Sequence, residues 1–258
     1  MHSNFVVIPA RGGSKGVLKK NLKIIHGKPL VVRSIIHATE LVPNENIILS
    51  TDSEEIIKVV SEYFGIKRIQ CKIDSLTRFG TFNLHYRNKK LSNDNALITD
   101  VLFSIYKLLK NQDLNPFTFC LLQPTTPFRS KVELKKIRKI LEKNLNSRIS
   151  LVSVRLVDEQ HPARMYKLGV NDILSPLTGF RKSLTFRRQD LPKIFLRDGG
   201  YYIIGVSLIK KKLQYNVRPR GFVRSFPWSI NIDTENDLLI ADSVKKIDVI
   251  WDPSFKKI

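Results

Sequence analysis

Short apolar segments alternate with amphipathic ones along the first part of the chain. Residues 5–8 and 46–50 are too short for helices and have the composition of buried strands. Residues 29–41 and the segment from Ser53 to Gly65 carry apolar side chains at helical spacing, and the serine and glycine suit the two ends of a helix. This alternation predicts an α/β fold, in which helices flank a mostly parallel sheet.

The pattern is less regular further on. It predicts strands at 66–73, 117–122, 150–156, 201–206 and 228–233, and helices at 94–109, 131–145 and from Thr234 onward, the last with Ile240, Val244 and Ile247 facing inward. Residues 74–90 show no clear period and predict a long surface loop, with a lid as the alternative. Residues 157–196 are rich in Pro, Gly and Arg and are poor material for a sheet or helix, so we expect a protruding arm inserted into one domain spanning 1–258.

The segment after the first predicted strand combines glycines with cations. Its members are Arg11, Gly12, Gly13, Ser14, Lys15, Gly16, Lys19, Lys20 and Asn21. Glycines let a backbone approach a ligand closely, and successive N–H groups in such a loop form a concavity that binds anions. The segment therefore predicts a cradle for a nucleoside triphosphate. It matches neither the P-loop nor the dinucleotide pattern, and a polar turn with incidental lysines is the alternative.

The position of this segment supports the cradle. Ligands of parallel sheets lie beyond the carboxyl ends of the strands, and both residues 11–21 and Asp52 follow predicted strands. Asp52 either contacts a substrate or caps the next helix.

Composition adds few constraints. The 44 Lys and Arg against 23 Asp and Glu give a net charge of +21, which makes a basic nucleic-acid-binding protein the alternative from a different class. The lysines are spread along the chain, however, and favour a general basic field that attracts anionic substrates. No apolar run approaches a membrane span and the first strand begins almost at once, so we expect a cytoplasmic protein with two buried thiols, Cys71 and Cys120.

Five separated segments together resemble the acylneuraminate cytidylyltransferases, or CMP-sialic acid synthetases. They are Ile8-Pro-Ala-Arg-Gly-Gly-Ser-Lys-Gly16 with Lys20-Asn21, Ser50-Thr-Asp-Ser53, Leu121-Leu-Gln-Pro-Thr-Thr-Pro-Phe-Arg129, Arg187-Arg-Gln-Asp-Leu-Pro192 and Ile232-Asp-Thr-Glu235. The resemblance implies a glycosyltransferase-A-like nucleotidyltransferase fold and a homodimer formed through the inserted arm. It implies transfer of CMP from CTP to a nine-carbon 2-keto-3-deoxy sugar acid, with Mg²⁺ and release of pyrophosphate.

The resemblance also implies roles for individual residues. Arg11, Ser14, Lys15 and Lys20, with Gly12 and Gly13, would hold the triphosphate; Asn21 and Arg87 would recognise cytosine, with Asp94 and Ala96 nearby; Gln123 would position the sugar; Arg164, Arg188 and Arg197 would contact the sugar acid, Arg164 from the partner subunit. The chemistry agrees, because lysine is a point charge suited to phosphate and arginine binds a carboxylate through two hydrogen bonds. Arg188 and its neighbour Arg187 could instead be surface charges or dimer contacts.

A magnesium ion needs one or two protein carboxylates beside substrate phosphates, and the resemblance assigns this role to Asp233 with Asn231. Asp233 could otherwise be the cap of the last helix. Asn231 replaces an Asp of the family pattern, and Gly199 stands where the sialic acid enzymes have Asn. These departures leave open a cytidylyltransferase for another acidic sugar, or a member that binds CTP without turnover.

Overall fold

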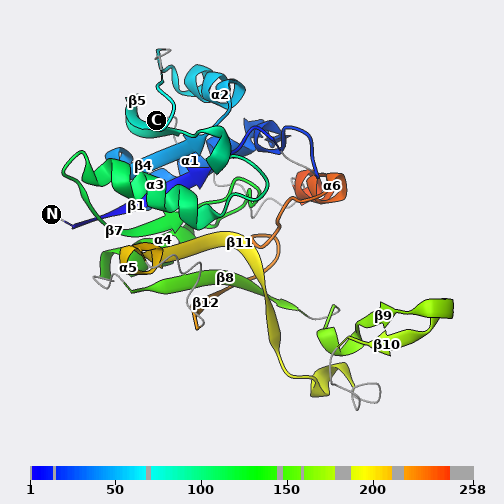
Figure 1. Cartoon of the computed structure of the whole chain (residues 1–258). Coiled ribbons are helices and arrows are strands. Elements are labelled where there is room, and N and C mark those ends of the chain that lie inside the picture. Colours follow the sequence, from blue (N-terminus) through cyan, green and yellow to red (C-terminus); the bar gives the residue numbers. More distant parts are fainter. Residues whose placement is uncertain are drawn as a thin grey trace.

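An eight-stranded sheet forms the centre of the structure, with helices on both faces (Figure 1). This computed structural model describes residues 2–13, 16–67, 71–143, 148–157, 160–177, 187–210 and 218–244. In sheet order the strands are β12 (Arg220–Arg224), β8 (Ser150–Val157), β11 (Ile194–Gly205), β7 (Asn115–Leu121), β1 (His2–Pro9), β4 (Ile47–Thr51), β6 (Phe82–Tyr86) and β5 (Ser75–Phe79).

The pairing of these strands is mostly parallel. Strands β7, β1, β4 and β6 run parallel, and β12 runs parallel to β8. Strand β11 is antiparallel to both β7 and β8, and β5 is antiparallel to β6. The predicted α/β class with a mostly parallel sheet is therefore confirmed.

Each face of the sheet has its own apolar core. Val6 and Ile8 of β1 pack with α1 (Leu30–Thr39), α2 (Glu54–Phe64) and α4 (Lys131–Lys143). Phe5 and Val7 pack on the other face with α3 (Ile98–Lys110) and α5 (Val206–Lys210). Successive side chains of a strand point to opposite faces, and a strand covered on both sides is apolar throughout, as residues 5–8 are.

The predicted helix ends around α2 and the last helix are confirmed. The Ser53 hydroxyl accepts a hydrogen bond from the N–H of Ile56, and Gly65 ends α2 in the left-handed conformation with φ of 65°. Thr234 begins α6 (Glu235–Ser243) through a reciprocal capping box with Asp237. Asp233 is therefore not the cap of this helix, and its carboxylate is left for other contacts.

The prediction for residues 66–90 is wrong in two respects. The described residues between 66 and 73 form no strand, and the segment predicted to be a loop contains the hairpin β5–β6. Gly80 turns the hairpin with φ of 60°, and the rings of Phe79 and Phe82 meet edge to face. The polar residues of β6 hide its alternation, because buried His85 and half-buried Asn83 have hydrogen-bond partners inside the fold.

Two predictions near the C-terminal end are also wrong. Residues 228–233 form no strand; they are apolar because Ile232 enters a small third core, where its N–H donates to the carbonyl of Thr125. In α6 it is Ala241 that is buried, whereas Ile240, predicted to face inward, is half exposed; Val244, directly after the helix, is buried as predicted. Residue 247 lies outside the described residues.

The predicted arm contains more regular structure than expected. Strands β9 (Tyr166–Leu168) and β10 (Leu174–Pro176) form a hairpin that projects away from the central sheet (Figure 1). The long strand β11 leads back from this region into the sheet. The limits of the arm and the single-domain assignment stay predictions. In the described part of the chain, no helix has both the length and the apolar character that a bilayer crossing requires.

Candidate nucleotide-binding site

A polar cavity of about 620 Å³ opens at the carboxyl ends of the central strands. Ten of the residues predicted to form or adjoin the site line it: Arg11, Gly13, Lys20, Asn21, Arg87, Asp94, Ala96, Gln123, Asn231 and Asp233. They come from segments that follow β1, β6 and β7 and from the segment before α6. Topology explains the meeting of the first three, because parallel strands bring their carboxyl ends to one edge of a sheet. The segment before α6 joins them through the hydrogen bond from Ile232 N to the Thr125 carbonyl.

The glycine-rich segment and Asp233 are in direct contact. A Cβ atom on Gly16 would lie 2.2 Å from the Asp233 carbonyl oxygen, so only glycine permits this approach of the two backbones. Lys20 Nζ lies 2.9 Å from Asp233 Oδ1. The early cations and the late carboxylate therefore belong to one crevice.

A second ion pair spans the cavity. Arg11 Nη1 lies 2.8 Å from Asp94 Oδ1, and both side chains are more than a third exposed. Helix α3 was predicted to start at Asp94 but starts at Ile98, which leaves Asp94 in the preceding loop. The carboxylate of Asp52 accepts a hydrogen bond from Gly12 N at 2.8 Å, so it holds the loop rather than capping α2.

Arg87 is held by a directed chain of hydrogen bonds. Its Nε donates to Ser50 Oγ and its Nη2 to the Ser50 carbonyl, at 2.9 and 2.6 Å. Arginine only donates, so the proton of the Ser50 hydroxyl is free for His85 Nδ1, 2.9 Å away, in the tautomer in which that nitrogen accepts. Burial lowers the pKa of His85 to about 4 and that of Arg87 to about 10, which leaves a neutral imidazole behind a charged guanidinium.

Polar groups on the other side of the cavity are arranged around Gly199. This glycine has φ of 78°, and a Cβ atom there would lie 2.9 Å from Gln123 Oε1 and 3.4 Å from Asn231 Oδ1. Asn231 Nδ2 donates to Asp233 Oδ2 at 2.5 Å, while its Oδ1 is buried and accepts no hydrogen bond from the described residues. Buried oxygens almost always have a partner, so this oxygen is available to a ligand.

The oxygens of Asn231 and Asp233 fit a magnesium ion. Mg²⁺ prefers hard oxygen ligands and takes only one or two carboxylates, with phosphates and water completing its shell. One carboxylate, one amide oxygen with no hydrogen-bond partner in the described part of the chain, and an adjacent cavity large enough for phosphate groups meet that description.

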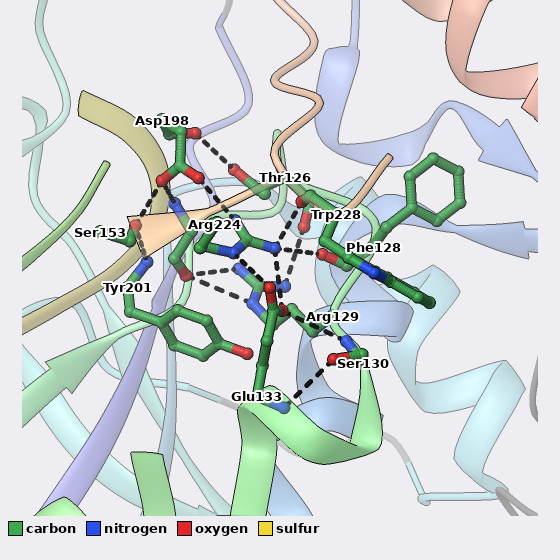
Figure 2. A network of polar contacts seen from close by, with 11 residues as sticks. Thr126, Phe128, Arg129, Ser130, Glu133, Ser153, Asp198, Tyr201, Arg224 and Trp228 are labelled. Atoms are coloured by element: carbon green, nitrogen blue, oxygen red, sulfur yellow. Dashed lines mark hydrogen bonds and ion pairs between the residues drawn. The ribbon is translucent and has the colours of Figure 1, made fainter. Parts of the chain in front are cut away.

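Beneath the cavity lies a buried polar network that the sequence did not reveal (Figure 2). Arg224 pairs with Asp198 at 3.1 Å and with both oxygens of Glu133 at 3.2 and 3.3 Å. Arg129 donates to the carbonyls of Gln123, Thr126 and Gly200. Arg129 belongs to a motif noted above, but an isolated arginine normally indicates surface, and nothing in the sequence marks Arg224 as buried.

Some predicted site residues do not line the cavity. Gly12 lies behind it, bonded to Asp52. Arg164 lies in a 3₁₀ turn of the arm, and Arg197 lies opposite Val154 on β8. Both are exposed, and neither is among the residues that line the cavity. Arg188 begins another 3₁₀ turn of the arm. Ser14 and Lys15 lie outside the described residues.

Comparisons with known proteins identify the family of this chain. Residues 5–222 match the family model described as cytidylyltransferase. The pseudaminic acid cytidylyltransferase of Campylobacter jejuni is 29% identical over 246 residues, which cover 95% of this chain and 97% of that protein. The CMP-N,N'-diacetyllegionaminic acid synthase of Legionella pneumophila is 27% identical over 254 residues, covering 93% and 95% of the two chains.

Solved structures show the same fold at low identity. A CMP:2-keto-3-deoxy-manno-octonic acid synthetase complexed with CTP superposes with a TM-score of 0.60 at 15% identity, covering 94% of this chain and 98% of that one. A putative glucose-1-phosphate thymidylyltransferase from Bacillus anthracis gives 0.59 at 12% identity, with 98% and 99% coverage. The predicted nucleotidyltransferase fold and the resemblance to acylneuraminate cytidylyltransferases are confirmed, and the chain belongs to the cytidylyltransferase family.

Proposed function

We propose that the protein transfers CMP from CTP to the anomeric hydroxyl group of a nonulosonic, sialic-acid-like sugar acid. The hydroxyl oxygen bonds to the α-phosphorus of CTP, and the bond from that phosphorus to the β-phosphate oxygen breaks. Pyrophosphate leaves and the hydroxyl proton is released. Such a transfer requires neutralised charge and in-line positioning more than a covalent catalyst.

One observation carries this proposal. Cationic side chains from the start of the chain and oxygen ligands from its end line one cavity at the carboxyl edge of the sheet. A nucleotide and its divalent ion require both kinds of group within a few ångströms of each other. The contact between Lys20 and Asp233 brings them together.

Arg11 and Lys20 are the groups we assign to the triphosphate. The Arg11–Asp94 pair is exposed on both sides, and exposed ion pairs contribute only ~0–1 kcal/mol each. Lys20 is only 11% exposed, but its partner Asp233 is 65% exposed and loses little solvation in the pair. Phosphate oxygens can therefore replace these carboxylates as partners at little cost. On this assignment the unliganded pairs keep the cations oriented toward the cavity.

Arg87 and Asn21 are assigned to cytosine. Arg87 Nη1 has no hydrogen bond among the described residues, although its Nε and Nη2 are bound to Ser50. Cytosine offers acceptors that suit such a donor. Asn21 is buried and donates to the Arg11 carbonyl, so its side-chain oxygen is the atom we assign to the base.

Asp233 and Asn231 are assigned to magnesium, and Gln123 to the sugar acid. A bound Mg²⁺ neutralises charge on the phosphates as pyrophosphate departs. Gln123 lies next to Asn231 across Gly199, so the sugar would sit close to the metal side of the cavity. Lys20 then stabilises charge at the breaking bond.

The arm is assigned to a homodimer. Its hairpin and the nearby part of β11 expose many large apolar side chains, and such contiguous surface usually marks an interface. They are Leu168, Val170, Ile173, Leu174, Phe195 and Leu196. Arg164, Arg188 and Arg197 belong to the same region; Arg164 is proposed to reach the sugar acid in the partner's site.

Analytical ultracentrifugation tests the dimer. Wild-type protein should sediment as two copies, and a Val170→Asp, Ile173→Asp variant as one copy with little transfer activity. Leu239→Asp is the matched control, because Leu239 is equally exposed but lies on α6 outside the arm. A monomeric wild-type protein with full activity contradicts the assignment.

Pyrophosphate release tests the reaction. The protein is incubated with CTP, Mg²⁺ and each of a panel of nonulosonic acids, and then with each component omitted or with ATP in place of CTP. We expect release only when CTP, the metal ion and one of the acids are present. Release without an acid, equal release from ATP, or CTP binding by calorimetry with no product from any acid overturns the proposal.

A further inference from the structure

The buried pair of Asp198 and Arg224 lies directly behind the part of the cavity assigned to the sugar acid. Both side chains are fully buried, and their charged atoms are 3.1 Å apart. Figure 2 shows the Arg224 guanidinium between this carboxylate and Glu133, with Arg129 alongside. Two guanidinium groups thus face two carboxylates, and the cluster is neutral overall.

This cluster joins three segments that are distant in sequence. Arg224 Nη2 donates to the Phe128 carbonyl at 2.7 Å and also to the Trp228 carbonyl. These carbonyls belong to the turn that carries Gln123 and to the segment that carries Asn231. Asp198 itself belongs to the bulge of β11, where the pairing with β8 shifts register between Arg197 and Tyr202.

The contacts of Asp198 determine the backbone around Gly199. Its Oδ1 accepts hydrogen bonds from Ser153 Oγ and from Gly200 N, and its carbonyl accepts one from Thr126 Oγ1 at 3.3 Å. Gly199 is therefore held on both sides in its left-handed conformation, next to Gln123 Oε1 and Asn231 Oδ1.

We propose that Asp198, through Arg224, is a positioning residue that sets the spacing of Gln123 and Asn231 around Gly199, and so determines how the acceptor sugar is oriented. This inference rests on the proposed function for the identity of the acceptor. The nucleotide side of the cavity, around Arg87, is supported separately through Ser50 and His85. Loss of the Asp198 contact should therefore affect the sugar acid and spare CTP.

Asp198→Asn and Glu133→Gln form a matched pair of variants. Each removes one negative charge from Arg224 at nearly constant volume, but Glu133 lies on α4, across the Arg224 guanidinium from Asp198 (Figure 2). We expect both variants to lower the midpoint of urea unfolding. Only Asp198→Asn should lower kcat/KM for the sugar acid, by about tenfold or more, because small misplacements of positioning groups have effects of this size. KM for CTP should change less than about twofold, far below the tenfold effect expected on the acceptor side.

Equal kinetic losses in the two variants, or wild-type kinetics in Asp198→Asn, overturn the proposal. If Asp198→Asn does not fold, Thr126→Val decides, since it removes one hydrogen bond to the Asp198 carbonyl without changing volume. A raised KM for the sugar acid then supports the proposal and an unchanged KM overturns it.

Failure of the proposed function is a separate outcome, because it appears as a wild-type protein that turns over no acid. The positioning role is then measured by crystallography of Asp198→Asn or, if that variant does not fold, of Thr126→Val. Displacement of Gly199 relative to Gln123 by more than about 0.5 Å, the tolerance of a functional site, supports the role. An unmoved Gly199 overturns it.

Discussion

The ion pairs inside the cavity and those beneath it use the same chemical groups in opposite surroundings. Arg11 and Asp94 are 36% and 47% exposed, whereas Arg224 and Asp198 are fully buried. Exposed pairs contribute little and exchange partners easily, while breaking a buried pair leaves an uncompensated charge. The exposed pairs that line the cavity can therefore rearrange around a ligand, whereas the buried pairs beneath it cannot.

The largest effect is expected from the buried side of this comparison. Arg224→Met leaves Asp198 and Glu133 without their cation and should lower the free energy of unfolding by about 3–5 kcal/mol. Urea denaturation at neutral pH measures the loss. Arg138→Met is the control, because it breaks an exposed pair with Glu142 on α4 and should change stability by only about 0.3–0.5 kcal/mol. Similar losses of unfolding free energy in the two variants would contradict the distinction between buried and exposed ion pairs.

Lys20→Ala tests the ion pairs that line the cavity. It should lower kcat/KM by about 10²–10³, the usual effect of removing one preorganised electrostatic group, while stability changes by less than about 1 kcal/mol. Lys19→Ala is the neighbouring control. Lys19 Nζ lies 2.8 Å from Glu55 Oε1, much as Lys20 Nζ lies 2.9 Å from Asp233 Oδ1, but Lys19 does not line the cavity. Steady-state kinetics and urea melts of both variants check this. Turnover close to wild type in Lys20→Ala would remove this lysine from the site.

The buried histidines His85 and His37 extend the comparison, because burial of their side chains makes the stability of the protein depend on pH. Burial lowers the pKa of His85 to about 4, and burial together with the nearby charges of Arg129, Arg33 and Arg224 lowers the pKa of His37 well below its ordinary value. Both are neutral when folded but protonate below about pH 6.5 when unfolded, so stability is complete above that pH and falls as pH decreases toward 4.

Replacing His85 by Asn isolates its share of this loss. Between about pH 7 and pH 5, wild type should lose on the order of 2 kcal/mol more stability than His85→Asn, a difference that follows from the pKa shift. Urea unfolding at the two pH values measures it. Parallel losses in the two proteins would show that His85 does not remain neutral in the fold.

Local chemistry explains what could be predicted from the sequence. The caps at Ser53, Gly65 and Thr234 depend on residues a few positions away, and parallel-sheet topology brings the segments after β1, β6 and β7 to one edge. Among the described residues Asp233 directly follows no strand, and its place beside Lys20 depends on the contact between the Ile232 N–H and the Thr125 carbonyl. The predicted cradle could be tested only in part, since residues 14 and 15 lie outside the described residues.

What could not be predicted depends on distant partners. His85 interrupts the apolar pattern of β6 because Ser50, on another strand, satisfies its ring nitrogen. Ile232 is apolar because of a core that it shares with α6, and no neighbouring strand pairs with the described residues around it. Arg224 is of a residue type usually found at the surface. It can be buried because the fold places the carboxylates of Asp198 and Glu133 beside it.

Strand β11 runs without interruption from Ile194, at the root of the arm, through the bulge at Gly199 to Gly205, deep in the sheet. Only four residues, 195–198, separate Ile194 from Gly199, the glycine beside Gln123 and Asn231. A displacement of the outer hairpin would therefore act through β11 on the backbone at Gly199, which the contacts of Asp198 hold in place. The arm and the cavity are thus joined by a single strand rather than by a loop.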